Sequence, residues 1–192
     1  SLKPLIETNS SELKIFEDIS NSFSEKMDQE LQKMWTRKIG LKECDEFLIN
    51  ELIDILFLTK ADFTKFFRIL SEIPYGIDEF KQSFYYPLSK EVEIQFLNWF
   101  VRWRELINKN EDLKAVSAEM KLINPKFSWR EWLVASAYQK AEVGDYSEVY
   151  ELLEVFSNPY HEHSNETQEK FDQLRPLSFF NKGGISHYSC SS

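Results

Sequence analysis

Cys190 is the residue of this 192-residue chain whose type and position best suit covalent chemistry. It stands third from the last residue, on a tail rich in Ser and Gly, where we expect an accessible and flexible backbone. Thiol–disulfide exchange requires such accessibility. Cys190 is therefore a redox candidate, and an inert free thiol is the alternative. The residue count permits a disulfide with Cys44, but we expect Cys190 to be free.

Three arginines could contact phosphate groups. Arg102 and Arg104 lie beside the aromatic stripe of one predicted helix, and Arg130 lies just inside the start of another. A guanidinium group binds phosphate or carboxylate oxygens through parallel hydrogen bonds. These side chains could therefore reach a nucleotide held by another part of a protein. Surface or interdomain ion pairs are the commoner role, and we favour them.

No pattern in the chain indicates a self-contained active site. His161 and His163 flank Glu162, but two imidazoles at this spacing need an extended backbone and further ligands to hold a metal, so a solvated loop is favoured. His187 near Cys190 also lacks further ligands. Nucleotide-binding glycine loops, the serine nucleophile elbow and the zinc motif His-Glu-x-x-His do not occur. We expect no catalytic residue and no metal site in this chain.

The composition restricts the partners and the compartment. The formal net charge of -9 argues against a nucleic acid or an anionic membrane as partner. Two cysteines are too few for a disulfide framework, which favours an intracellular protein, cytoplasmic or, in a eukaryote, mitochondrial. No apolar run approaches the roughly 20 residues that span a bilayer.

The spacing of apolar residues predicts the helices that position these candidate cysteine and arginine side chains. Five Gly and six Pro are few for this length, which argues against sandwiches and barrels. Residues 11–38 form a predicted amphipathic helix that ends at Gly40 and whose apolar stripe comprises Phe16, Ile19, Phe23, Met27, Leu31 and Met34. Residues 45–58 are apolar on more than one face, which predicts a central helix.

The middle of the chain is rich in aromatic residues. Thr59 and Asp62 resemble a capping box for a helix that stops before Pro74, and an ordered loop is expected over 74–88. Ser89 then caps a helix to about residue 107. Its stripe is predicted to be core rather than a ligand site and comprises Phe96, Trp99, Phe100 and Trp103. Asn110 is expected to cap a short helix.

A helical hairpin is predicted over residues 124–160. Asn124 suits the N-cap with Pro125 at the first helical position, and Ser128 with Glu131 offers a second start. Gly144 is expected to end this helix, because glycine adopts the left-handed conformation that follows a helix. Asp145 and Glu148 are expected to cap the second helix, which Asn158-Pro159 ends, and a polar, loop-like stretch follows. Apolar side chains of the tail are expected to pack on the body: Leu177, Phe179, Phe180, Ile185 and Tyr188.

Short motifs over nearly the whole chain resemble the C-terminal part of the selenoprotein O family. They are Asp62-Phe63-Thr64, Phe67-Arg68, Leu70-Ser71, Trp99 with Arg102-Trp103-Arg104, Asn124-Pro125, Arg130, Leu133, Gly144-Asp145 and Asn158-Pro159. The final Ser189-Cys190-Ser191-Ser192 is similar to the family's chain end, where Cys or selenocysteine stands third from the terminus. In the family this position is thought to form a reversible disulfide with a cysteine of the activation segment.

Every long periodic stretch is helical, which predicts an all-α array of about six to eight amphipathic helices with an irregular tail. The resemblance implies that this array corresponds to the C-terminal helical region of a kinase-like fold. The length suits one domain or two small ones, and we expect one helical domain, residues 1–180, and a Cys-containing tail, residues 181–192. The family transfers AMP from ATP to Ser, Thr or Tyr hydroxyls of proteins. Residues 1–6 are similar to the end of the helix that follows the family's activation segment. The catalytic residues are therefore expected to precede this chain.

The expected cofactor of the full-length protein is Mg-ATP, and none is expected for this chain alone, which we predict to be inactive. The expected partners are the N-terminal kinase-like lobe of the same protein and protein substrates, with no nucleic acid and no membrane. The alternative is a helical protein-interaction module without catalytic function.

Overall fold

The computed structural model describes residues 10–180, and within this range all regular secondary structure is helical. The elements are α1 (Ser10–Lys38), α2 (Glu46–Thr59), α3 (Phe63–Ser71), η2 (Ile77–Ser83), α4 (Lys90–Ile107), α5 (Leu113–Ile123), α6 (Glu131–Glu142), α7 (Ser147–Ser157), α8 (Asn165–Phe171) and η3 (Leu177–Phe179), where η denotes a 3-10 helix. The all-α prediction is confirmed. No helix of this range is long and apolar enough to cross a membrane.

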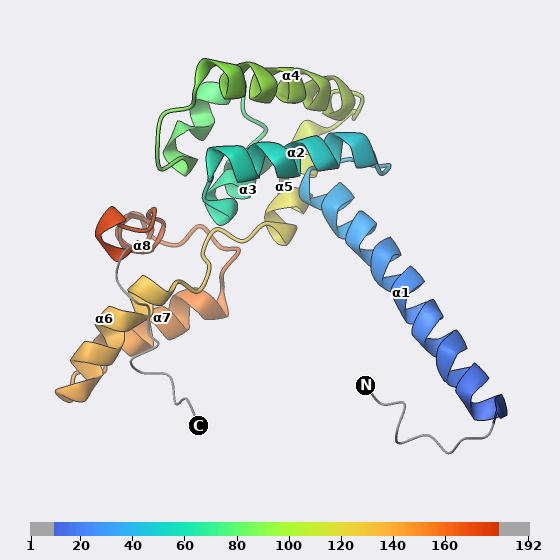
Figure 1. Cartoon of the computed structure of the whole chain (residues 1–192). Coiled ribbons are helices and arrows are strands. Elements are labelled where there is room, and N and C mark those ends of the chain that lie inside the picture. The colour runs from blue at the N-terminus through green and yellow to red at the C-terminus, as the bar shows by residue number, and fades with distance from the viewer. Residues whose placement is uncertain (1–9, 181–192) are drawn as a thin grey trace.

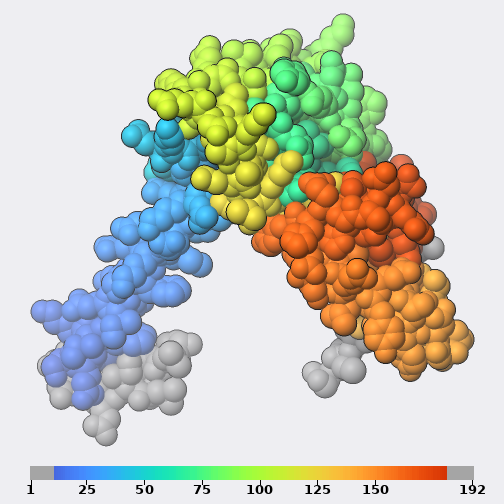
Figure 2. All heavy atoms as spheres, turned by 180° about the vertical axis from the view of Figure 1, so that it is seen from behind, coloured from blue at the N-terminus to red at the C-terminus, as the bar shows by residue number. Residues whose placement is uncertain are grey.

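The helices form an arch. Helices α2 to α5 make its top, α1 projects from one side, and the α6–α7 hairpin projects from the other (Figure 1). The space-filling view shows that the two projections are separated by open space (Figure 2). Each projection therefore has surface that no other described part of the chain covers.

The larger hydrophobic cluster lies in the top of the arch, around α4. Trp99 and Trp103 are fully buried, and their rings stack with centroids 6.1 Å apart. Their indole N–H groups donate to the carbonyls of Leu48 (2.9 Å) and Ile39 (2.8 Å), so the polar edge of each ring is satisfied. The prediction that the aromatic stripe is core is confirmed.

A smaller cluster lies in the second projection. It comprises Phe127, Leu133, Ala137, Leu152, Val155 and Phe171. These residues come from α6, α7, α8 and the segment before α6. Residues 10–180 thus form two apolar clusters, and polar contacts described below join them.

Several predicted helix ends agree with the structure. Ser89 is the N-cap of α4 and accepts a hydrogen bond from the N–H of Val92. Gly40 and Gly144 follow the ends of α1 and α6 with positive φ angles of 72° and 86°. Only glycine adopts such angles without strain, which is why the sequence signal was clear.

Two predicted starts lie a few residues from the observed ones. Asp62 is itself the N-cap of α3, where it accepts from the N–H of Lys65, because α2 extends through Thr59. Helix α5 is capped by Asp112 rather than by Asn110. The side chain of Asn110 instead donates to the carbonyl of Ile107. The loop predicted over 74–88 is ordered and contains η2.

The predicted role of Asn124 is wrong. Asn124 follows the end of α5, and α6 begins only at Glu131, so neither Asn124 nor Ser128 is its N-cap. The amide of Asn124 is fully buried and donates to the carbonyl of Lys38 (2.8 Å) and to the hydroxyl of Ser71 (3.0 Å). The amide oxygen, which an N-cap would use as acceptor, accepts instead from Lys38 Nζ at 2.8 Å.

The second half of the hairpin also differs from the prediction. Asp145 accepts from the N–H of Ser147, but Glu148 does not complete a capping box. Its buried carboxylate accepts a hydrogen bond from the hydroxyl of Ser136 at 2.8 Å. The polar stretch after residue 160 contains α8, capped by Ser164, which the low apolar content did not predict.

Helix α2 is not central in the described structure. One face packs on α4, but the opposite face remains exposed, with Phe57 84% and Phe47 66% accessible. Apolar residues on several faces were the signal for a central helix. Here they mark a surface that no described part of the chain covers.

Candidate functional site

A row of ion pairs joins α3 to the segments around the second cluster, and we call this row the polar seam. Its central contact is between Asp62 and Arg130. Arg130 Nη2 donates to Asp62 Oδ1 at 2.8 Å, and Nη1 donates to Oδ2. Burial alone would raise the pKa of Asp62, but the hydrogen bond and the charge of Arg130 hold that pKa below its ordinary value. The carboxylate therefore stays ionised inside the protein.

Three more ion pairs extend the polar seam along α3. Lys65 Nζ donates to the carboxylate of Asp172 at 2.8 Å and to its carbonyl at 2.9 Å. Glu162 accepts from both Arg68 and Lys126. Burial would raise the pKa of Glu162, but hydrogen bonds from these two cations lower that pKa to about 2.

Helix α3 can serve both clusters because its polar and apolar residues alternate with helical spacing. Phe66, Phe67 and Leu70 point into the larger cluster and are buried. The cations Lys65 and Arg68 lie three residues apart, which puts them on one common face. The sequence of α3 thus dictates an apolar contact on one side and an ionic contact on the other.

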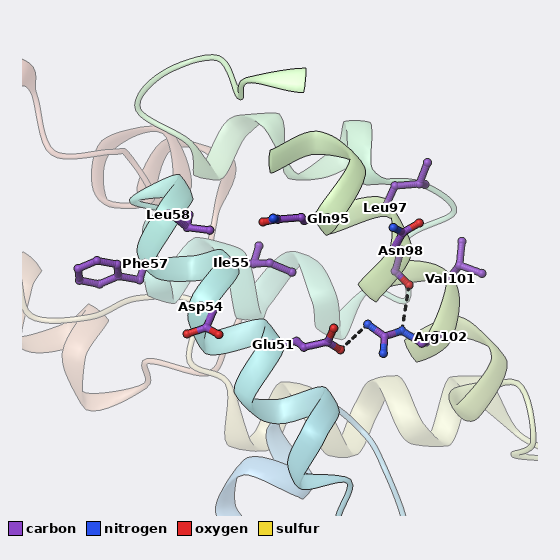
Figure 3. A pocket seen from close by; sticks show the side chains of 10 residues that line it. All are labelled: Glu51, Asp54, Ile55, Phe57, Leu58, Gln95, Leu97, Asn98, Val101 and Arg102. Atoms are coloured by element: carbon purple, nitrogen blue, oxygen red, sulfur yellow. Dashed lines mark hydrogen bonds and ion pairs between the residues drawn. The ribbon is translucent and has the colours of Figure 1, made fainter. Parts of the chain in front are cut away.

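A groove between α2 and α4 forms a second candidate site, with a volume of about 950 Å³. Figure 3 shows Arg102 and Glu51 reaching toward one another from the two helices, where they form an ion pair. The exposed side chains of Phe57, Leu97 and Val101 make much of the remaining lining. The groove is open and mostly apolar.

The three arginines proposed from the sequence contact different elements. Arg102 pairs with Glu51 of α2, Arg130 pairs with Asp62, and Arg104 Nη1 lies 3.5 Å from the carbonyl of Ile73. A role in contacting phosphate stays a prediction. Sequence reasoning missed Asp62 as the partner of Arg130, because Asp62 also fitted a helix cap.

The remaining sequence candidates are of two kinds. In the His161–His163 run, Glu162 is held by Arg68 and Lys126, and His163 Nε2 lies 2.9 Å from the carbonyl of Asn158. Within residues 10–180 no group of three or more His, Cys, Asp or Glu side chains could hold a metal ion. Cys190 lies outside the described residues.

The start of the tail contacts the α6–α7 projection and the loop between η2 and α4. The rings of Phe179 and Trp132 lie 6.4 Å apart, and those of Phe180 and Tyr85 lie 5.1 Å apart. Leu177 is 54% exposed. The predicted packing is therefore partial here, and the predicted contacts of Ile185 and Tyr188 lie outside the described residues.

Comparison with known proteins decides the family. The profile of the family described as protein adenylyltransferase SelO matches residues 1–157. This chain belongs to that family. Protein nucleotidyltransferase YdiU of Tolumonas auensis is 32% identical over 178 residues, which cover 88% of this chain and 34% of the relative. The YdiU proteins of Flavobacterium johnsoniae (32%) and Dechloromonas aromatica (31%) cover 92% and 91% of the chain and 36% and 35% of their own length.

The chain therefore spans about a third of the length of the YdiU relatives that it matches. Several residues that carry the resemblance to the SelO family lie in or beside the polar seam, among them Asp62, Arg68, Asn124 and Arg130. In this SelO family member, these residues have structural contacts with one another.

Proposed function

We propose that this chain is the C-terminal helical domain of a protein adenylyltransferase, whose catalytic residues precede Ser1 in the full-length protein. The observation that carries the proposal is the SelO family match over residues 1–157 in a chain that spans about a third of its relatives. The proposed activity is that of the family, protein adenylyltransferase SelO. This chain contributes helices that support the catalytic part.

The proposed reaction moves AMP from ATP to a Ser, Thr or Tyr hydroxyl of a protein. The hydroxyl oxygen forms a bond to the α-phosphorus, the bond to the leaving pyrophosphate breaks, and the hydroxyl proton passes to a base. Mg-ATP would supply the nucleotide and the charge neutralisation of its phosphates. The guanidinium groups of Arg102 and Arg130 already bind carboxylates, so these residues do not fit the phosphates of ATP in this arrangement. We derive no step of the reaction from them.

Radiolabelled ATP tests the assignment. The full-length protein, purified with its magnesium, is expected to label itself or an added protein with AMP, whereas the 192-residue chain is not. Calorimetry with Mg-ATP on the chain alone is the companion measurement. Micromolar affinity of this chain for Mg-ATP would contradict the placement of the nucleotide site. A full-length protein that neither binds nor transfers the nucleotide would favour the helical interaction module.

We also propose that Cys190 is a free thiol in this chain and takes part in redox regulation of the full-length enzyme. The support is its position near the chain end and the resemblance of the last four residues to the family. Alkylation of the unreduced, denatured chain followed by mass measurement is the test. Two modified cysteines are expected, and none would mean that Cys44 and Cys190 are bonded to each other.

A further inference from the structure

Most of α1 lies outside the body of the protein with its apolar stripe exposed. The last turns, from about Met34, contain its buried residues, and within residues 11–33 only Leu13, Phe16 and Ser22 are partly buried. Upstream, Ile19 is 62% exposed, Phe23 67% and Met27 50%. Figure 1 shows this part of the helix projecting away from the other helices that the structure describes. Such a contiguous exposed apolar surface is typical of an interaction site.

The sequence of this projection is a poor helix on its own. Ser20, Asn21, Ser22 and Ser24 occupy its middle, and these residue types have low helix propensity. Isolated helices are marginal in water, and helices in proteins are stabilised mainly by packing of an apolar face. Helix α1 therefore needs a partner surface along this stripe to stay helical.

The spacing and the charge of the stripe disfavour a second copy of this chain. Ile19, Phe23, Met27 and Leu31 follow one another at intervals of four, whereas a heptad coiled coil alternates three and four. The stripe therefore does not repeat as a coiled-coil seam. Residues 11–33 also carry six acidic residues and three lysines, so two copies would repel each other.

We propose that the α1 stripe, from Phe16 to Leu31, is the docking surface for the polypeptide that precedes Ser1 in the full-length protein. This inference rests on the proposed function. The relatives are about three times as long as this chain, which supplies an occupant of sufficient size. Helix α1 is the first described element, so the preceding polypeptide joins the chain close to the projecting end.

The chemistry of helix α1 also predicts the surface of the polypeptide that docks on it. The occupant presents an apolar strip with basic side chains along its rim, because the helix combines exposed Phe, Ile and Met with an excess of carboxylates. The other end of α1 is fixed to the body of this chain. There Trp35 packs on the rings of Phe63 and Phe67, with centroids 6.1 and 5.9 Å away.

Hydrogen–deuterium exchange measured by mass spectrometry tests the docking. Peptides covering residues 15–31 are compared between this chain alone and the full-length protein. We expect exchange in the full-length protein to be at least about tenfold slower, because docking must open before these amides exchange. In the full-length protein, Phe23→Glu is expected to abolish that protection. Asn21→Glu adds the same charge two residues away, on the opposite face of the helix, and is expected to leave it unchanged.

The outcomes separate this inference from the proposed function. Equal exchange in the two wild-type proteins overturns the docking surface even if the full-length protein transfers AMP, and this reading does not depend on the folding of any variant. Slow exchange without AMP transfer overturns the proposed activity and keeps the docking surface. Protection in the isolated chain that rises with its concentration, and is lost in Phe23→Glu, would show a second copy as occupant and overturn the proposal.

Discussion

Asp62 and Arg130, 68 residues apart in the sequence, share two hydrogen bonds across the polar seam. The side chain of Asp62 is 4% exposed and that of Arg130 is 13% exposed. Asp62 also caps α3, through the N–H of Lys65. One carboxylate therefore starts a helix and holds the segment before α6 at the same time.

Removing the cation from this pair is expected to be costly. Arg130→Met leaves a buried carboxylate without its main partner, and breaking a buried ion pair on one side costs about 3–5 kcal/mol. We expect a loss of about 3 kcal/mol in the free energy of unfolding, because Lys65 still donates to Asp62. Urea denaturation followed by circular dichroism measures it.

The matched control for that variant is Arg102→Met. The Arg102–Glu51 pair is also a single Arg–carboxylate contact between two segments, but its side chains are 39% and 31% exposed. Exposed pairs contribute about 0–1 kcal/mol, so this variant is expected to unfold almost like the parent. Equal losses at the two sites would contradict the importance of burial in the polar seam.

Acid is expected to weaken the seam at Glu162. The folded-state pKa of Glu162 is about 2, below its ordinary value of 4.5, so the contact stabilises the fold fully above about pH 4.5 and is lost as the pH falls toward 2. The carboxylate is 51% exposed, so solvent screening reduces the contribution to about 1 kcal/mol. Glu162→Gln should therefore be less stable than the parent at pH 7. The urea midpoints of the two proteins should converge as the pH falls from about 4.5 toward 2, and a constant gap would refute the assignment.

The tryptophans of the aromatic core are expected to be essential for folding. Trp99→Ala and Trp103→Ala each remove a fully buried ring, which costs about 3–5 kcal/mol, comparable to the stability of a whole domain. Trp129 is 65% exposed, and Trp129→Ala should cost less than about 1 kcal/mol. The melting temperatures of the three variants, measured against that of the parent, test this expectation. Parent-like melting of both core variants would mean that α4 does not organise the larger cluster.

Two glycines with similar backbones are expected to respond differently to alanine. Gly144 has a φ of +86° and open space where a Cβ would lie, so Gly144→Ala should cost about 1–2 kcal/mol from backbone strain alone. At Gly40, with a φ of +72°, a Cβ would lie 2.5 Å from Met120 Sδ and 3.0 Å from Val116 Cγ1. Overpacking adds about 1–3 kcal/mol there. Denaturation midpoints that fall equally in both variants would exclude the close approach of α1 and α5.

The fold was predictable from the sequence where short-range rules decide it. The period of the aromatic stripe of α4 and the positive φ of Gly40 follow from residue type and spacing alone. Caps were less certain, because Asp, Asn and Ser occur at several neighbouring positions and tertiary contacts choose among them. Asn124 shows this, since its amide binds Lys38 and Ser71 rather than the start of a helix.

The polar seam could not be predicted in the same way. For Arg130 the sequence left two roles, an ion pair with an acid or a phosphate contact, and 32 acidic residues were available as partners. The choice of Asp62 depends on how α3 and the hairpin approach each other, which no local pattern encodes. The sequence also could not predict that α1 projects from the body, because the apolar stripe of an amphipathic helix has the same spacing whether or not another element covers it.

The contacts of Asn124 connect the two projections of the arch mechanically. Its side chain binds Lys38, the last residue of α1, and its carbonyl accepts a hydrogen bond from Arg68, which also holds Glu162 of the opposite projection. A helix of 29 residues is about 43 Å long, so a small displacement at its far end turns its anchored end with considerable leverage. Such a rotation would move Lys38, and with it Asn124 and Arg68. The two projections thus share one hydrogen-bonded junction, through which a rotation of α1 would act on the segment that contains Glu162.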